Sequence, residues 1–181
     1  MRQFIQQLEA LAKSHKTDAK WVFVPTRSLA ATLPERLLHR GCDWANFRFV
    51  TPFEVALEMV GPALVSAGIR PKPEELGPLL IARLATALPD DVSPHFRPLL
   101  SQPGMDVCLW RTLHELRMAG VEPKQLIGKL ENAKEAELVA LFQAYVDYLA
   151  EHRMADRAEV FLRAANLKIR KRIVFVMVVN S

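Results

Sequence analysis

Two short apolar segments near the N-terminus, each followed by a helical pattern, constrain the fold more than any other feature. Trp21–Pro25 is rich in Val and Phe, and Phe47–Thr51 is a second run of the same kind. Both lead into segments whose apolar residues recur at three-to-four spacing, as they do in the segment before the first run. Strands that alternate with helices form parallel sheets covered by helices. The first 66 residues therefore predict the order helix, strand, helix, strand, helix.

The helix expected after the first strand has its own start and stop signals. Ser28 is expected to cap it, and Gly41 is expected to close it in a left-handed conformation. Pro34 lies inside this segment, so either the helix kinks there or its regular part begins near Thr32. Pro52 is suited to the first turn of the next helix.

The middle of the chain changes character. From residue 74 to about residue 165 the pattern is helical and strand signals are lacking, whereas Ile173–Val179 predicts a strand buried on both faces. The sequence therefore predicts an α/β fold with about three parallel strands. Residues 1–66 and 167–181 are expected to form its core, and residues 67–166 a large all-helical insertion. Because a turn and a helix normally follow such a strand, the early end of the chain indicates a fragment.

Net charge and hydrophobic patterning indicate a soluble protein but do not identify its partner. The 181 residues carry a net charge of +4, which permits a nucleic-acid partner but does not argue for one. The basic cluster at Lys168–Arg172 is either a phosphate-facing patch or, as the pattern favours, a solvated run before a strand. No signal-peptide pattern and no membrane-spanning run is found, so a cytoplasmic, soluble protein with no membrane partner is expected.

Patterns for metals and nucleotides are lacking. Cys42 and Cys108 are isolated and the histidines are scattered, so no zinc site is expected. A Walker A loop needs glycines whose N–H groups surround the phosphates, yet no glycine precedes Gly41. The Lys16-Thr17 pair follows a helix rather than preceding one. The sequence therefore predicts no cofactor for this chain.

The sequence contains the residue types of a nuclease motif, but in an unsuitable structural context. Asp90 followed by Glu122-Pro123-Lys124 has the residue types of a PD-(D/E)xK site. The second group is expected in a turn between helices, and Pro cannot lie in a central strand. A small metal-dependent nuclease is therefore the third-ranked interpretation of the chain.

Other polar and aromatic residues are better explained by structure. Asp156 is expected to cap a helix, with Glu159 at capping-box spacing. Trp110 and Tyr145 lie on apolar helical faces and are expected in the core. Trp44, in a polar stretch, is the aromatic residue expected to be partly exposed.

The turn after the first strand is the main candidate site. Thr26, Arg27 and Ser28 combine hydroxyls and a guanidinium at the carboxyl end of a strand and the start of a helix. Ligands bind at this edge of open parallel sheets, and helix N-termini favour phosphate. The residues alone leave two alternatives, a phosphate contact of a nucleic-acid backbone or an ordinary turn with a capping serine.

The order of these motifs resembles superfamily 1 helicases. WVFVPTRSLAATLPERLLHRG is similar to motif Ia, and FRFVTPFEVALEM to the next strand of that family, which ends in Thr51. LHELRMAGVEPKQL and ELVALFQAYVDYLAEHRMADRAEVFLRAA resemble the inserted 1B subdomain, and IVFVMVV takes the place of the Walker B strand. The turn Pro25–Ser28 and the pattern around Asp156 most resemble AddB-type subunits of bacterial helicase–nuclease complexes.

The resemblance implies an incomplete P-loop NTPase-like core, because the Walker A loop, the acidic residues after the last strand and the nuclease domain are all lacking. It implies a non-catalytic, helicase-like DNA-binding region of an exonuclease subunit acting in double-strand break repair and recombination. The implied partners are single-stranded or end-processed DNA, contacted by Thr26, Arg27, Ser28 and Thr51, and a helicase–nuclease subunit. ATP and Mg²⁺, and the hydrolase activity of the parent protein, are implied only for members with intact Walker motifs. The alternative interpretation is a helical protein–protein interaction module braced by the sheet.

Overall fold

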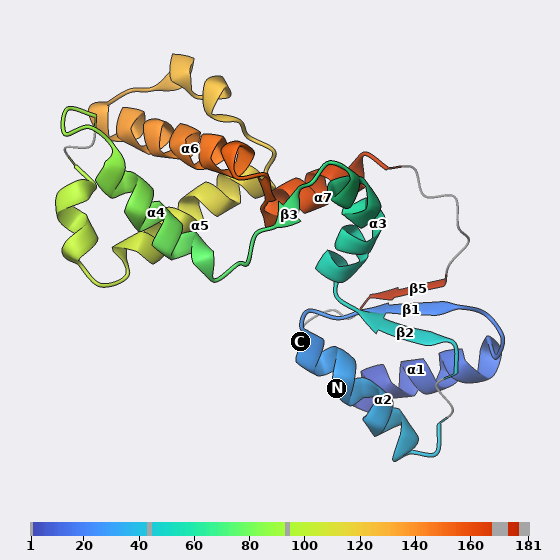
Figure 1. Ribbon diagram of the computed structural model, residues 1–181. Coiled ribbons are helices and arrows are strands. Elements are labelled where there is room, and N and C mark those ends of the chain that lie inside the picture. The colour runs from blue at the N-terminus through green and yellow to red at the C-terminus, as the bar shows by residue number, and fades with distance from the viewer. Residues whose placement is uncertain (1, 43–44, 93–94, 168–173, 178–181) are drawn as a thin grey trace. The chain divides into compact units, whose positions relative to one another are not determined.

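A computed structural model describes residues 2–42, 45–92, 95–167 and 174–177. The chain divides into two compact units, one comprising Met1–Met59 with Leu167–Ser181 and the other Val60–Asn166. The division falls inside one helix, seven residues before the predicted boundary between residues 66 and 67. Figure 1 shows the helices and strands of both units.

The first unit contains a small parallel sheet. Strand β1 (Lys20–Phe23) pairs in parallel with β2 (Phe47–Val50), with Lys20 opposite Phe47. Strand β5 (Val174–Met177) pairs in parallel with the other edge of β1. The parallel pairing of the two N-terminal strands is thus confirmed, in a chain that is otherwise mostly helical. The prediction that the last strand is buried on both faces concerns side chains outside the described residues.

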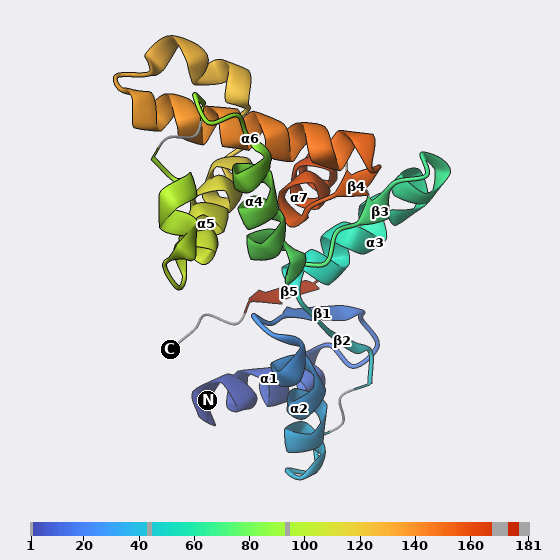
Figure 2. The same ribbon diagram turned by 60° about the vertical axis from the view of Figure 1, so that its left-hand side comes forward.

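Helices α1 (Arg2–Ser14) and α2 (Arg27–Leu38) lie together on one face of this sheet in both views (Figures 1 and 2). Both are amphipathic, and each directs apolar residues at helical spacing toward the sheet. The resulting core buries the following side chains: Ile5, Leu8, Val22, Val24, Leu33, Leu37 and Phe47. Helix α3 (Pro52–Ser66) follows β2 and begins with proline at its first position, as predicted.

The start of α2 differs from the prediction. The cap is Thr26, whose hydroxyl accepts a hydrogen bond from the Leu29 N–H at 3.2 Å, so the assignment of Ser28 as the cap is wrong. The helix also runs through Pro34 from its first turn and does not begin near Thr32. Its end is as predicted, because Gly41 has a φ of 66°.

The second unit is built mainly from helices. Two-residue strands, β3 (Arg70–Pro71) and β4 (Met154–Ala155), pair in parallel within it, so the expectation of an all-helical insertion is wrong in this detail. Such a bridge is too short to produce a period-two pattern. The helical elements are α4 (Leu76–Ala87), α5 (Met105–Met118), α6 (Ala133–Glu151) and α7 (Arg157–Ala165), with 3₁₀ turns at Arg97–Ser101, Pro123–Gln125 and Ile127–Lys129.

Helices α4, α5 and α6 surround the apolar core of this unit. Trp110 and Tyr145 meet edge to face there, with ring centroids 5.5 Å apart, and both are buried as predicted. Gly77 allows α4 to approach, since a Cβ at that position would lie 2.3 Å from Trp110 Cε2. No helix in the described ranges is both long and apolar enough to cross a membrane.

Candidate functional site

Two turns at the carboxyl ends of neighbouring strands form the candidate site in the first unit. The turn after β1 places Thr26 as the cap of α2 and Arg27 as its first residue. The turn after β2 places Thr51 immediately before α3. Because β1 and β2 are parallel and adjacent, both helices begin at the same edge of the sheet.

Glu54 organises the second turn. Its Oε2 accepts hydrogen bonds from the Thr51 N–H at 2.8 Å and from the Thr51 hydroxyl at 3.0 Å. The Glu54 N–H in turn donates to Thr51 Oγ1 at 3.2 Å. These reciprocal contacts are a capping box, which provides partners for N–H groups that the first turn of a helix leaves unpaired.

The same carboxylate joins the two turns. The Arg27 Nε donates to Glu54 Oε1 at 2.7 Å, while 78% of the Arg27 side chain remains exposed. The hydrogen bond from the Thr51 N–H is the main cause that lowers the pKa of Glu54; burial opposes it, and the Thr51 hydroxyl and Arg27 reinforce it. Glu54 is therefore an ionised link between the starts of α2 and α3.

The four predicted site residues differ in what they offer to a ligand. Thr26, Arg27 and Ser28 are exposed, whereas Thr51 is buried and its hydroxyl is bonded to Glu54. The structure brings all four to one edge of the sheet. It adds Glu54, which could have been recognised from the Thr51-x-x-Glu54 spacing before an apolar run.

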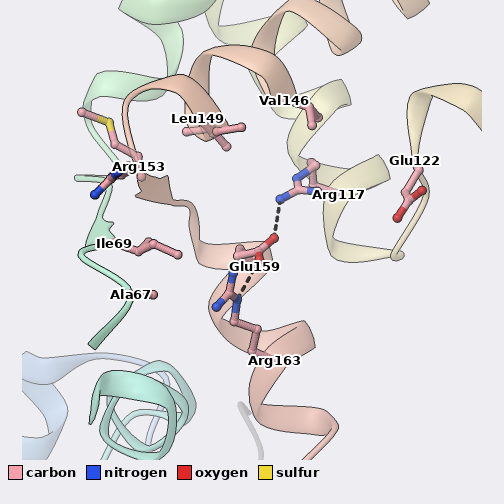
Figure 3. A pocket seen from close by; sticks show the side chains of 11 residues that line it. Ala67, Ile69, Arg117, Glu122, Val146, Leu149, Arg153, Glu159 and Arg163 are labelled. Carbon is pink, nitrogen blue, oxygen red and sulfur yellow. Dashed lines mark hydrogen bonds and ion pairs between the residues drawn. The ribbon is translucent and has the colours of Figure 1, made fainter. Parts of the chain in front are cut away.

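A second polar cluster lies in the helical unit. Asp156 caps α7 as predicted, accepting from the Glu159 N–H at 2.8 Å. Its buried carboxylate also accepts from Arg117 Nε and Nη2, at 3.1 and 3.2 Å, and from the Tyr145 hydroxyl at 3.1 Å. Glu159 Oε2 accepts a hydrogen bond from Arg117 Nη2 at 3.1 Å, and Glu159 Oε1 accepts one from Arg163 Nε at 2.7 Å (Figure 3).

The electrostatics of this cluster keep its groups in their usual charge states. Burial opposes the charge of Arg117, but hydrogen bonds and attraction from Asp156 and Glu159 outweigh it and raise its pKa. Burial is also the main cause that raises the pKa of Tyr145, with Asp156 reinforcing it, so its hydroxyl remains a donor. The cluster is a fully bonded link between α5, α6 and α7.

The residues of the nuclease pattern have local partners. Glu122 caps the 3₁₀ turn and pairs with Lys124 at 2.6 Å, and Asp90 pairs with Arg97. Across the described ranges, no group of three or more His, Cys, Asp or Glu side chains is placed to hold a metal ion. Glu122-Pro123-Lys124 lies in a turn, as its proline indicated.

Two further sequence interpretations, the exposure of Trp44 and the role of the basic cluster at Lys168–Arg172, concern residues outside those described. No protein-family model matches the chain, and the comparison with curated proteins finds no match.

Proposed function

We propose that this chain is a non-catalytic, helicase-like DNA-binding region of an AddB-like exonuclease subunit that acts in double-strand break repair and recombination. On this proposal its sheet corresponds to part of a P-loop NTPase-like core. Its partners are single-stranded or end-processed DNA and a helicase–nuclease subunit. Thr26, Arg27, Ser28 and Thr51 form the phosphate-contacting edge, and the chain itself binds no ATP or Mg²⁺.

The exposed guanidinium of Arg27 at the start of α2 supports this proposal best. The N-terminus of a helix carries a partial positive charge that favours bound anions, and the guanidinium of Arg27 adds a full positive charge at the same place. Glu54 engages only Nε of that guanidinium, so both terminal nitrogens are left to contact an anion from solvent. A backbone phosphate placed at this turn would meet Arg27 together with the first N–H groups of α2.

Single-strand binding by matched variants tests the proposal. Arg27→Ala is expected to weaken binding of a fluorescent oligothymidylate by about tenfold, the effect of losing one charge-assisted hydrogen bond. Arg36→Ala removes the same charge from the exposed face near the end of the same helix, and its effect is expected to be much smaller. Unchanged affinity in Arg27→Ala would contradict the proposed site.

The alternative interaction module depended on exposed apolar side chains along α6. In the structure every large apolar side chain of this helix is buried or half-buried, including Phe142 and Leu149. The surface required by that alternative is therefore not offered by α6.

The third interpretation, a nuclease using Asp90, Glu122 and Lys124, is tested by a magnesium-dependent cleavage assay, in which we expect no cleavage.

A further inference from the structure

A cavity of about 600 Å³ lies in the helical unit, between the segment that follows α3, the ends of α5 and α6, and helix α7. Figure 3 shows its labelled lining residues, with Glu159 between Arg117 and Arg163 and with Arg153 beside Ile69. Apart from Glu122, the other lining residues are apolar: Ala67, Ile69, Val146, Leu149, Ala150 and Met154. The cavity thus combines an apolar body with several arginines.

The charges that line the cavity do not cancel. Glu159 bridges Arg117 and Arg163, and Glu122 is paired with Lys124. Arg117 is further neutralised by Asp156 behind the wall. Within the described part of the chain, the Arg153 guanidinium forms no hydrogen bond or ion pair. The exposed guanidinium of Arg153, at the rim of the cavity, is therefore left without a carboxylate partner.

The backbone of Arg153 adopts a conformation that is unusual for a residue with a side chain. Arg153 follows α6 with a φ of 50°, in the left-handed region that a β-carbon disfavours. The turns that end α2, α3 and α5 use Gly41, Gly68 and Gly120 at such a position, with φ between 66° and 72°. Glycine is the usual residue there because it adopts this conformation without strain.

The main-chain contacts of Arg153 do not require its side chain. Its N–H donates to the Ala150 carbonyl at 3.2 Å, and its carbonyl accepts from the Arg70 N–H at 2.9 Å in the β3–β4 pair. A glycine would form both hydrogen bonds. The guanidinium lies against Gly68, at a distance where an added Cβ would be 3.4 Å from Nη1. A left-handed residue that could be glycine, with an exposed and unpaired guanidinium at the rim of a cavity, motivates the hypothesis that its side chain has a function.

We propose that this cavity binds a small organic oxyanion, a phosphate or carboxylate carried on an apolar body, with Arg153 as the residue that contacts the oxyanion. The planar guanidinium fork matches both oxyanions. The aliphatic walls accommodate the apolar body of the ligand, as in most small-molecule sites. This proposal is independent of DNA binding at Arg27, because it rests on different residues in the other unit.

Probe binding to the full chain tests it. Phenyl phosphate and benzoate each carry an oxyanion on an apolar ring, and benzyl alcohol is a neutral control. Titration calorimetry is expected to detect at least one of the two anions and not the alcohol, and the relative affinities distinguish phosphate from carboxylate. Binding of neither anion, or equal binding of benzyl alcohol, would overturn the proposal.

The decisive variant is Arg153→Gly, which installs the residue that ends α2, α3 and α5. We expect it to raise the melting temperature of the ligand-free chain, because the strain of the left-handed conformation is relieved. We also expect it to lower the affinity for the anion by tenfold or more. Arg111→Gln removes one exposed positive charge elsewhere in this unit and is expected to leave anion affinity unchanged.

A lower melting temperature for Arg153→Gly would show that the side chain is structural and overturn the proposal, as would unaltered anion affinity. Oligothymidylate affinity is expected to be unaffected by Arg153→Gly, so a failure at this cavity is separable from a failure at Arg27.

Discussion

Arg27 and Glu54 form an ion pair, with Nε and Oε1 2.7 Å apart, between the first residue of α2 and the first turn of α3. This contact joins the two strand-end turns that form the candidate site. It also places a carboxylate beside the guanidinium that we propose contacts phosphate. Glu54 therefore has two opposing effects, because it stabilises the start of α3 while it repels an incoming anion.

Glu54→Gln is expected to strengthen oligothymidylate binding. Removing one negative charge about 4 Å from a bound phosphate relieves roughly 1 kcal/mol of repulsion in water, which corresponds to about fivefold in affinity. Fluorescence anisotropy at low salt measures this change. The matched control is Glu35→Gln, which removes an exposed carboxylate elsewhere on α2. Weaker binding by Glu54→Gln would mean that Glu54 positions Arg27 rather than competing for it.

Glu54 is also expected to make stability depend on pH. Its pKa is lowered from the ordinary value of 4.5, first by the hydrogen bond from the Thr51 N–H. A depressed folded-state pKa contributes stability above the unfolded value, and this contribution is lost as the pH falls through the folded value. Urea unfolding should therefore show wild type exceeding Glu54→Gln at neutral pH and the difference shrinking below pH 4.5. A difference that stays constant down to acid pH would contradict this role.

The buried cluster around Asp156 predicts unequal effects of two substitutions. Asp156→Ala leaves Arg117 buried without its main partner and removes the cap of α7, so a loss of about 3–5 kcal/mol is expected. Tyr145→Phe removes one hydrogen bond but leaves Asp156 bonded to Arg117, so a loss of about 1 kcal/mol is expected. Urea denaturation followed by circular dichroism compares them, and losses of similar size would contradict the expected order.

The approach of α4 to Trp110 predicts opposite effects of the same substitution at two glycines. Gly77→Ala would place a Cβ 2.3 Å from the Trp110 ring and is expected to cost about 1–3 kcal/mol. Gly61→Ala meets no atom within 4 Å inside helix α3 and should stabilise the chain by about 0.5–1 kcal/mol. Melting temperatures that move in the same direction for both variants would contradict the close packing of α4 on Trp110.

Local patterns predicted the elements well and the contacts between them poorly. The strands at Trp21–Pro25 and Phe47–Thr51 were recognisable because a short run rich in Val and Phe between two helical patterns is typical of a buried strand. The cap at Asp156 was recognisable because its spacing is local. Thr26 and Ser28 are both hydroxyl residues within one turn, and spacing alone does not show which of them caps the helix. The cap at Thr51 with Glu54 follows the capping-box spacing, which is also local and therefore recognisable from sequence.

Contacts between distant residues could not be predicted in this way. The Arg27–Glu54 and Arg117–Asp156 pairs join residues 27 and 39 positions apart, and nothing in one sequence marks such partners. The β3–β4 bridge has two residues in each strand, too few to show a period. The left-handed Arg153 occupies a position where glycine is the usual signal, so the pattern that normally reveals such a turn is missing.

The salt dependence of single-strand binding tests the central proposal most directly. For single strands, log K falls with log salt concentration by about 0.7 for each phosphate neutralised. If Arg27 contacts a phosphate, Arg27→Ala should bind oligothymidylate more weakly and with a slope smaller by about 0.7, whereas Arg36→Ala should retain the wild-type slope. No measurable binding by the wild-type chain at low salt, or identical slopes for wild type and Arg27→Ala, would contradict the proposed DNA-contacting edge.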